Sequence, residues 1–150
     1  MNLPLHAPWA IALLLFLTPA SRAGAEELEL LQSSTSDQGV HLHTVQSRYQ
    51  SGTTQLRVIL PDNVQQGERL ASIYVLPVET GLETGYGDGV AEILKNDLHN
   101  RFRLVYIAPS FSQLPWYADH PSDAGIQQES YLLRDVIPFV EKFYPVRRQS

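Results

Sequence analysis

Two short runs of apolar residues constrain the fold of this chain more than any other feature. The first run, 71–78, contains four consecutive apolar or aromatic side chains from Ile73 to Leu76, and the second extends over 102–108. Apolar residues without polar alternation are typical of strands that are covered on both faces, as in a parallel sheet. The sequence therefore predicts two buried strands and a domain of the α/β class.

An amphipathic helix is predicted after each of the two runs. The first begins after Asp88, a suitable N-cap, and extends to about His99. Its inner stripe is predicted to contain Val90, Ala91, Leu94 and Leu98. The second covers 127–143, and its polar side holds Pro138, whose missing N–H a bend around the core would relieve. The apolar face of this second helix is predicted to contain Leu133, Val136, Ile137, Val140 and Phe143.

An antiparallel pair of strands is predicted before the first apolar run. Polar and apolar residues alternate over 40–45, and 53–60 has the character of a second strand after the turn at Ser51 and Gly52. Residues 26–39 are mostly polar and are interpreted as a lead-in to the domain. The predicted order is thus an antiparallel pair, then strand, helix, strand and helix.

This element order resembles the opening half of an α/β-hydrolase. The aromatic loop from Ser110 to Pro121 adds to the resemblance. It is similar to the loop of esterase D, feruloyl esterases and mycolyltransferases in which an aromatic pair and an acidic residue lie near the catalytic pocket. The resemblance implies a partial three-layer α/β sandwich over residues 40–150.

The resemblance also defines what the chain would lack. In α/β-hydrolases the nucleophilic serine lies in a G-x-S-x-G elbow after the fifth strand, with the acid and the histidine further along. The sequence contains no G-x-S-x-G, and by element count it stops before that strand. We therefore expect a domain truncated before the nucleophile strand, with no catalytic residue of its own. The strand around 73–76 would then be an open apolar edge through which copies of the chain self-associate.

Two segments are candidates for the pocket that the resemblance implies. Val78 and Glu79 follow the first apolar run, where the family offers a backbone N–H to the oxyanion. Trp116, Tyr117 and Asp119 are candidates for a substrate wall on which a sugar or an aryl ester would stack. Each segment also has a simpler interpretation. The first is an ordinary turn after a strand, and the second is a loop packed by its own aromatic residues.

The first 25 residues are predicted to be a secretory signal. The apolar run from Trp9 to Leu17 is too short to span a bilayer, and 23–25 forms an A-x-A cleavage site. We expect a secreted or periplasmic protein whose mature chain begins at Glu26 and has no transmembrane segment. The alternative is an N-terminal anchor that is not cleaved.

Charge and residue spacing weigh against several other kinds of site. The net charge is -5 and the basic residues are not clustered, which argues against nucleic acid as a partner. His41 and His43 share one face of a strand, but the remaining histidines lie on other elements, so no metal site is expected. The glycine-rich segment 85–89 does not have the spacing of a phosphate loop. No cofactor is predicted.

Three hypotheses for function follow. The first is an exported esterase-like α/β-hydrolase that acts on a small-molecule ester in its complete form, with this chain inactive alone. The alternative is a small exported binding protein that holds a carbohydrate or aryl ligand at Trp116 and Tyr117. The third is a degenerate gene product with no folded function.

Overall fold

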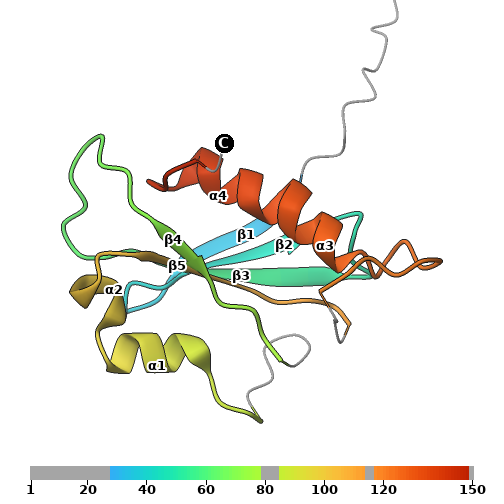
Figure 1. Cartoon of the computed structure of the whole chain (residues 1–150), viewed down its shortest axis with the longest axis horizontal. Helices are drawn as coiled ribbons and strands as arrows, with labels where there is room; N and C mark the ends of the chain where they lie inside the picture. Colours follow the sequence, from blue (N-terminus) through green and yellow to red (C-terminus); the bar gives the residue numbers. More distant parts are fainter. Residues whose placement is uncertain (1–27, 79–84, 114–116, 149–150) are drawn as a thin grey trace, which may run out of the picture.

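The computed structural model describes residues 28–78, 85–113 and 117–148, in which a five-stranded sheet lies between two helical layers (Figure 1). The strands are β1 (Glu29–Thr35), β2 (His41–Gln46), β3 (Thr53–Ile59), β4 (Ser72–Tyr74) and β5 (Val105–Pro109). Their order in the sheet is β1-β2-β3-β5-β4. β4 is parallel to β5, and the other neighbours are antiparallel. The predicted antiparallel pair is confirmed as β2 and β3, and the predicted signal lies outside the described residues.

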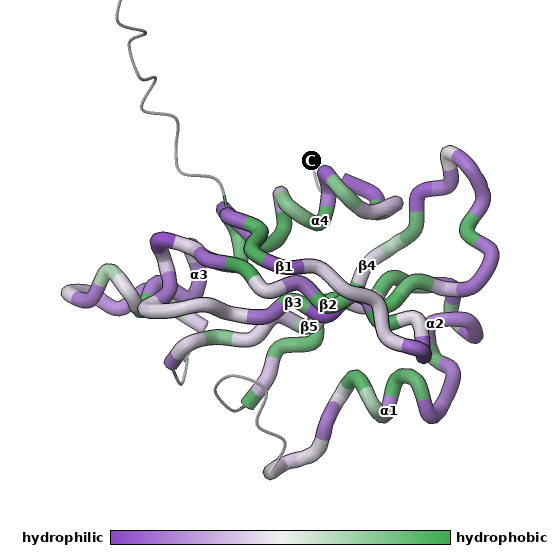
Figure 2. The backbone as a smooth tube through the Cα atoms, turned by 180° about the vertical axis from the view of Figure 1, so that it is seen from behind, coloured by the Kyte–Doolittle hydropathy of each residue, from purple (hydrophilic) through white to green (hydrophobic). Residues whose placement is uncertain are grey.

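The predicted three layers are confirmed, because helices cover both faces of the sheet (Figures 1 and 2). One face carries α1 (Gly89–Lys95) and α2 (Leu98–Arg101). The opposite face carries one long helix, in which α3 (Gln128–Ser130), the π-helical segment η1 (Tyr131–Val136) and α4 (Ile137–Phe143) follow without interruption.

The core is divided between the two faces by the alternation of side chains along the strands. The cluster beneath the long helix includes Val45, Leu56, Val58, Val105, Ile107, Val136 and Val140. The cluster beneath α1 includes Val40, Ile59, Val90, Ile93, Tyr106 and Ala108. Successive residues of β5 belong to different clusters, so this strand is covered on both sides, as its apolar sequence predicted.

The interpretation of 26–39 as a polar lead-in is wrong for Glu29–Thr35, which forms β1. The strand pairs antiparallel with β2 and contains a register shift between Leu30 and Gln32. All seven of its residues are exposed. A strand exposed on both faces has no burial pattern, and the bulge interrupts any alternation, so the sequence carries no period-2 signal.

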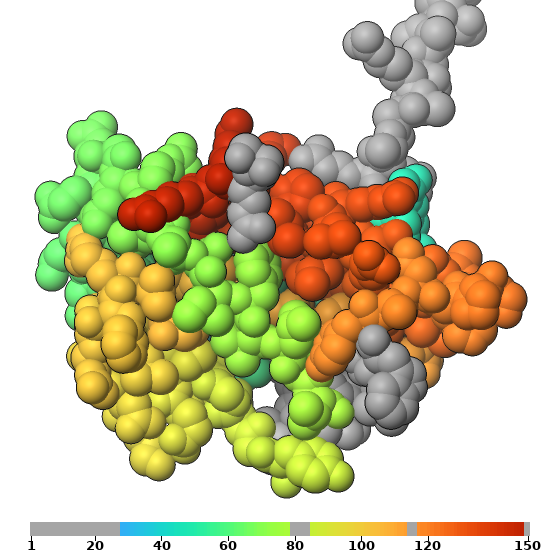
Figure 3. Space-filling view, viewed as in Figure 1, coloured from blue at the N-terminus to red at the C-terminus, as the bar shows by residue number. Residues whose placement is uncertain are grey.

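The first apolar run forms a shorter and less buried strand than predicted. β4 has three residues, and Ile73 is 41% exposed, whereas all five residues of β5 are buried. Ile73 is exposed because β4 is the last strand of the described sheet. Along Ser72–Tyr74 it has a neighbouring strand on only one side. Figure 3 shows this segment (light green) at the surface, between the yellow α1–α2 layer and the orange and red long helix.

The position of the first predicted helix is confirmed, but the prediction of its buried residues is partly wrong. Asp88 is the N-cap, and its side chain accepts a hydrogen bond from the N–H of Val90. Val90 and Ile93 are buried, whereas Ala91 is exposed. The helix also stops before His99, because Asp97 adopts a positive φ of 52° and separates α1 from α2.

The long helix covers the predicted range, but its predicted apolar face is partly wrong. Leu133 and Phe143 are exposed, and the buried apolar residues are Tyr131, Val136, Phe139 and Val140. The wider turn of η1 shifts the face that meets the sheet, which a constant helical period does not anticipate. Pro138 is exposed and is the second residue of α4, directly after η1 and inside the continuous helix.

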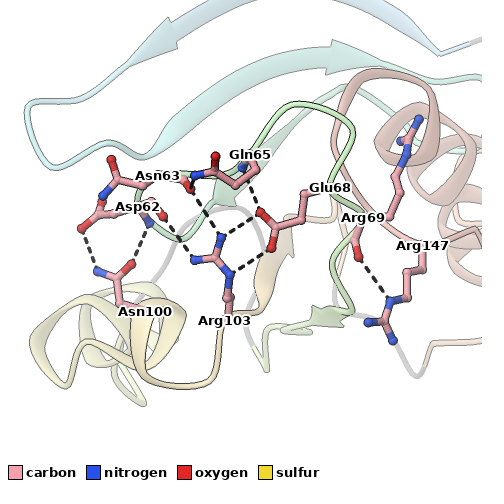
Figure 4. A network of polar contacts seen from close by, with 8 residues as sticks. All are labelled: Asp62, Asn63, Gln65, Glu68, Arg69, Asn100, Arg103 and Arg147. Carbon is pink, nitrogen blue, oxygen red and sulfur yellow. Dashed lines mark hydrogen bonds and ion pairs between the residues drawn. The ribbon is translucent and has the colours of Figure 1, made fainter.

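After α4 the chain returns to the outer side of β4. Val146 forms a parallel bridge with Leu70, in which the N–H of Leu70 donates to Pro145 O and the N–H of Arg147 donates to Leu70 O, both at 2.8 Å. The Arg147 side chain also donates to the carbonyl of Arg69 at 3.3 Å (Figure 4). Val146 is 1% exposed, so this returning segment is part of the core.

The connector before β4 is fastened to the turn before β5. Arg103 donates to both carboxylate oxygens of Glu68, at 2.9 and 2.8 Å (Figure 4). Asn100 donates to the carboxylate of Asp62 at 3.0 Å and accepts from its N–H at 2.7 Å. These contacts fix the amino ends of the two parallel strands relative to each other, and hence where their carboxyl ends emerge.

Candidate functional site

The carboxyl ends of β4 and β5 meet at one edge of the sheet. In open α/β sheets, ligands bind outside the carboxyl ends of the strands. The described segments at this edge are 75–78 after β4, 110–113 after β5, and 117–128, which leads into the long helix. Val78, Tyr117 and Asp119, the described residues of the two predicted pocket segments, belong to this edge.

A buried polar cluster fixes the residues that follow β5. Gln50 Nε2 donates to Gln128 Oε1 at 2.6 Å, and Gln50 Oε1 accepts from the N–H and the hydroxyl of Ser112 at 3.0 and 3.1 Å. Gln128 Nε2 donates to the carbonyl of Gln113 at 3.3 Å. Gln50 is 6% exposed and Gln128 is 1% exposed. The cluster ties three distant parts of the chain together, and sequence reasoning missed it because glutamines in turns and at helix starts usually face solvent.

Three aromatic rings lie next to this cluster. Phe111 is 1% exposed and makes edge-to-face contacts with Tyr131 and Tyr117, with ring centroids 5.6 and 5.8 Å apart. Burial raises the pKa of both tyrosine hydroxyls. Tyr131 shares a hydrogen bond of 2.7 Å with Thr54, which satisfies its hydroxyl inside the core.

Tyr117 links the two predicted pocket segments. Its hydroxyl donates to the carbonyl of Pro77, the residue before Val78. Tyr117 has a positive φ of 55° and is 37% exposed. Positive φ in a bulky residue is uncommon and clusters at functional sites. Val78 itself is 66% exposed, whereas Glu79 and Trp116 lie outside the described residues.

Asp119 holds the start of the long helix. Its carboxylate accepts from the N–H of Ser130 at 2.9 Å and from the Ser130 hydroxyl at 2.6 Å. Burial alone would raise the pKa of Asp119, but the hydrogen bonds from Ser130 outweigh it and keep the pKa below its ordinary value. Both carboxylate oxygens are therefore occupied by the protein's own backbone and hydroxyl, in support of the packed-loop interpretation for this residue.

The two strand histidines are engaged in structural contacts. His41 Nδ1 lies 3.2 Å from the Thr35 hydroxyl, and His43 shares a hydrogen bond with the Tyr144 hydroxyl. Burial, with a smaller effect of His41, lowers the pKa of His43. Across the described ranges no group of three or more His, Cys, Asp or Glu side chains is placed to hold a metal ion. Nor does any helix there have the length and apolar character needed to cross a membrane.

Comparison with known proteins gives one informative result. Neither a family model nor a curated protein matches the sequence. Among solved structures, an S-formylglutathione hydrolase from Agrobacterium tumefaciens is similar, with a TM-score of 0.57 and 13% sequence identity. The match covers 79% of this chain and 49% of that chain. The chain thus spans about half the length of its structural neighbour, and it has the fold of part of an α/β-hydrolase.

Proposed function

We propose that this chain is the N-terminal half of an exported esterase of the α/β-hydrolase class. The complete protein would hydrolyse or transfer the acyl group of a small-molecule or carbohydrate ester by a serine mechanism. The serine, its acid and its histidine would all come from residues after Ser150. In support, the described sheet is matched by a hydrolase of about twice the length of the matched region.

The observation that carries the proposal is the parallel bridge between Leu70 and Val146. The carbonyl of Ala71 and the N–H of Val75 bond to β5, at 3.0 and 2.7 Å. Backbone groups alternate in direction along a strand, so Leu70 bonds on the opposite side, where 145–147 lies. The backbone groups of Ser72 and Tyr74 point to that same outer side. In the proposal, this bridge is the start of a parallel strand that continues along the outer side of β4.

In this proposal the polypeptide after Arg147 forms the next parallel strand, on the outer side of β4. Its carboxyl end would reach the edge where the segments after β4 and β5 emerge. A nucleophile elbow there would face Val78 and Glu79, whose backbone N–H groups would stabilise the oxyanion of the tetrahedral intermediate. Trp116 and Tyr117 would form the wall for the acyl or alcohol part of the ester, and Asp119 would hold that wall in place.

The proposal also includes the export of the protein and the absence of hydrolase activity in this chain alone. Residues 1–25 would direct secretion or transport to the periplasm, and residues 26–150 would carry no hydrolase activity alone. An assay with p-nitrophenyl acetate tests the second statement. We expect residues 26–150 to hydrolyse the ester no faster than a heat-denatured sample. Turnover that a serine-directed phosphonate abolishes would show that a nucleophile is present and would contradict the proposal.

A non-catalytic binding protein is the competing outcome. A half-domain with an open strand edge is expected to self-associate or to be poorly soluble. A monodisperse monomer of residues 26–150 that unfolds cooperatively, and whose tryptophan fluorescence changes with an aryl glycoside, would favour the binding protein instead. Trp116 is the single tryptophan after residue 25, so the signal has one source.

A further inference from the structure

A hollow of about 450 Å³ lies where the turn after β2 meets the loop before α3. It is lined by Arg48, Tyr49, His120, Pro121, Ser122, Ala124 and Gln127. The turn and the loop lie at the same end of the sheet (Figure 1). This volume falls in the range of small-molecule sites. Five of these residues belong to the 117–128 segment described above, but none is among the residues proposed for the ester pocket.

The walls of the hollow are joined by backbone hydrogen bonds. The N–H of Gln127 donates to the carbonyl of Tyr49 at 3.0 Å, and the N–H of His120 donates to the carbonyl of Ile126 at 2.8 Å. The side-chain amide of Gln127 donates to the carbonyls of His120 and Asp123 at 2.7 and 2.6 Å. The side chains that line the hollow are thus carried on a fixed frame.

The Arg48 guanidinium contacts the Tyr49 phenol at this frame. Arg48 Nη2 donates to the Tyr49 hydroxyl at 2.7 Å, and the Arg48 guanidinium lies 4.8 Å from the centre of the Tyr49 ring. The hydrogen bond from Arg48, and to a lesser degree one from Arg134, lowers the pKa of Tyr49. A guanidinium thus lies beside the Tyr49 oxygen, and the Asp135 carboxylate is close enough to interact with Arg48.

His120 contributes a further hydrogen-bond donor, and its contacts indicate which ring nitrogen carries the proton. Its Nδ1 accepts from the N–H groups of Ser122 and Asp123, at 3.3 and 3.0 Å. An acceptor at Nδ1 requires the proton of the neutral ring to be on Nε2. The neutral imidazole thus presents its Nε2–H from the other edge of the ring, and His120 lines the hollow.

The lining residues supply donors from a guanidinium, an imidazole and hydroxyls, and they include no carboxylate. We propose that this hollow binds a small oxyanion, the carboxylate or phosphate group of a solute, through Arg48, His120 and the Tyr49 hydroxyl. Planar guanidinium groups suit both kinds of oxyanion. The proposal does not depend on the ester chemistry proposed above.

The test is a titration of the 150-residue chain with inorganic phosphate and, separately, with acetate, followed by two-dimensional NMR at low ionic strength. We expect saturable shifts of the His120 ring and of the 120–127 amides. Arg48→Gln and His120→Gln should each weaken binding about tenfold, the value of one charge-assisted hydrogen bond. Shifts with phosphate alone would identify a phosphate site, and shifts with acetate would identify a carboxylate site.

Arg101→Gln is the matched control, because Arg101 is exposed on α2 on the other face of the sheet. It should leave binding unchanged, and Arg48→Lys should retain part of it. The melting temperature of each variant shows whether it is folded. The absence of saturable shifts with both anions would overturn the proposal. So would equal binding by the wild-type, Arg48→Gln and His120→Gln chains.

Discussion

The two edges of the described sheet end the hydrogen-bonding ladder in different ways. β1 has seven exposed residues, mostly polar, and a register shift between Leu30 and Gln32. Bulges and polar side chains are devices that discourage further pairing at an edge. In contrast, β4 is only three residues long and pairs with β5 without a register shift. Leu70, two residues before it, forms a bridge with Val146 on its outer side. The described sheet therefore ends differently at its two sides, and in the function proposed above β4 is an interior strand of a larger sheet.

The largest expected effect concerns self-association. Residues 26–150 should form oligomers through β4, and Ile73→Lys should convert them to monomers because a charge on the edge opposes pairing. Leu31→Lys is the matched control, since Leu31 on β1 is 46% exposed and Ile73 is 41% exposed. Sedimentation velocity measures the distribution. A wild-type monomer, or an equal effect of Leu31→Lys, would remove the difference between the two edges.

The second effect concerns stability at the same two edges. Val146→Ala should lower the free energy of unfolding by about 2 kcal/mol, because two methylene equivalents and their packing are lost from a buried site. Leu30→Ala on β1 should cost less than about 0.5 kcal/mol, since Leu30 is 45% exposed. Urea unfolding followed by circular dichroism gives both values. Equal costs would mean that the segment at 145–147 is not part of the folded sheet.

A third effect is the pH dependence of the free energy of unfolding. It is expected on the β1 side of the sheet, where His43 attaches β2 to the chain after α4. The pKa of His43 is lowered in the fold, mainly by burial, so the unfolded chain binds the proton more strongly. Stability is then complete above the unfolded pKa of about 6.5 and is lost as the pH falls through the folded pKa. The melting temperature should be lower at pH 5 than at pH 7.5, and His43→Gln should reduce this difference.

Asp135 is expected to change stability with pH in the direction opposite to His43, and it therefore provides a check on the assignment to His43. Its pKa is raised, mainly by burial and despite the hydrogen bond from Ser47, so its contribution is lost as the pH rises through the folded pKa. Asp135→Asn should therefore steepen the loss of stability on acidification that His43 causes. If the melting temperature of the Asp135→Asn variant did not change between pH 7.5 and pH 5, the assignment to His43 would be contradicted.

The smallest effect is expected at α1, which covers the β4 side. Asp88→Ala should cost about 1 kcal/mol, because the N-cap bond to Val90 is lost. Asp88→Asn keeps the cap and removes only the charge that pairs with Arg57 at 2.9 Å. Both partners are partly exposed, so this variant should cost little. If Asp88→Asn and Asp88→Ala lower the free energy of unfolding equally, the ion pair rather than the cap stabilises the start of the helix.

The sequence predicted the elements whose side chains have one clear periodicity. β2, β3, β5 and the α1 cap at Asp88 follow alternation, a continuous apolar run and capping chemistry, each of which is local. β1 was missed because its exposure on both faces leaves no pattern. The buried face of the long helix was partly wrong because η1 changes the turn.

The candidate site could be located only in part for a similar physical reason. Its position after the two apolar runs follows from strand order, but its support by Gln50 and Gln128 depends on contacts between residues 78 positions apart. Nothing in a local window distinguishes such glutamines from solvated ones. The occupied carboxylate of Asp119 likewise becomes visible only when Ser130 is placed beside it.

The most direct measurement of the central claim, that β4 is an interior strand of a larger hydrolase, is the nucleotide sequence that follows the codon for Ser150. We expect one of the three frames to encode a short apolar strand in continuation of Val146, followed by G-x-S-x-G. A stop codon followed by unrelated sequence in all three frames would contradict the claim, and β4 would then be an edge that the protein keeps.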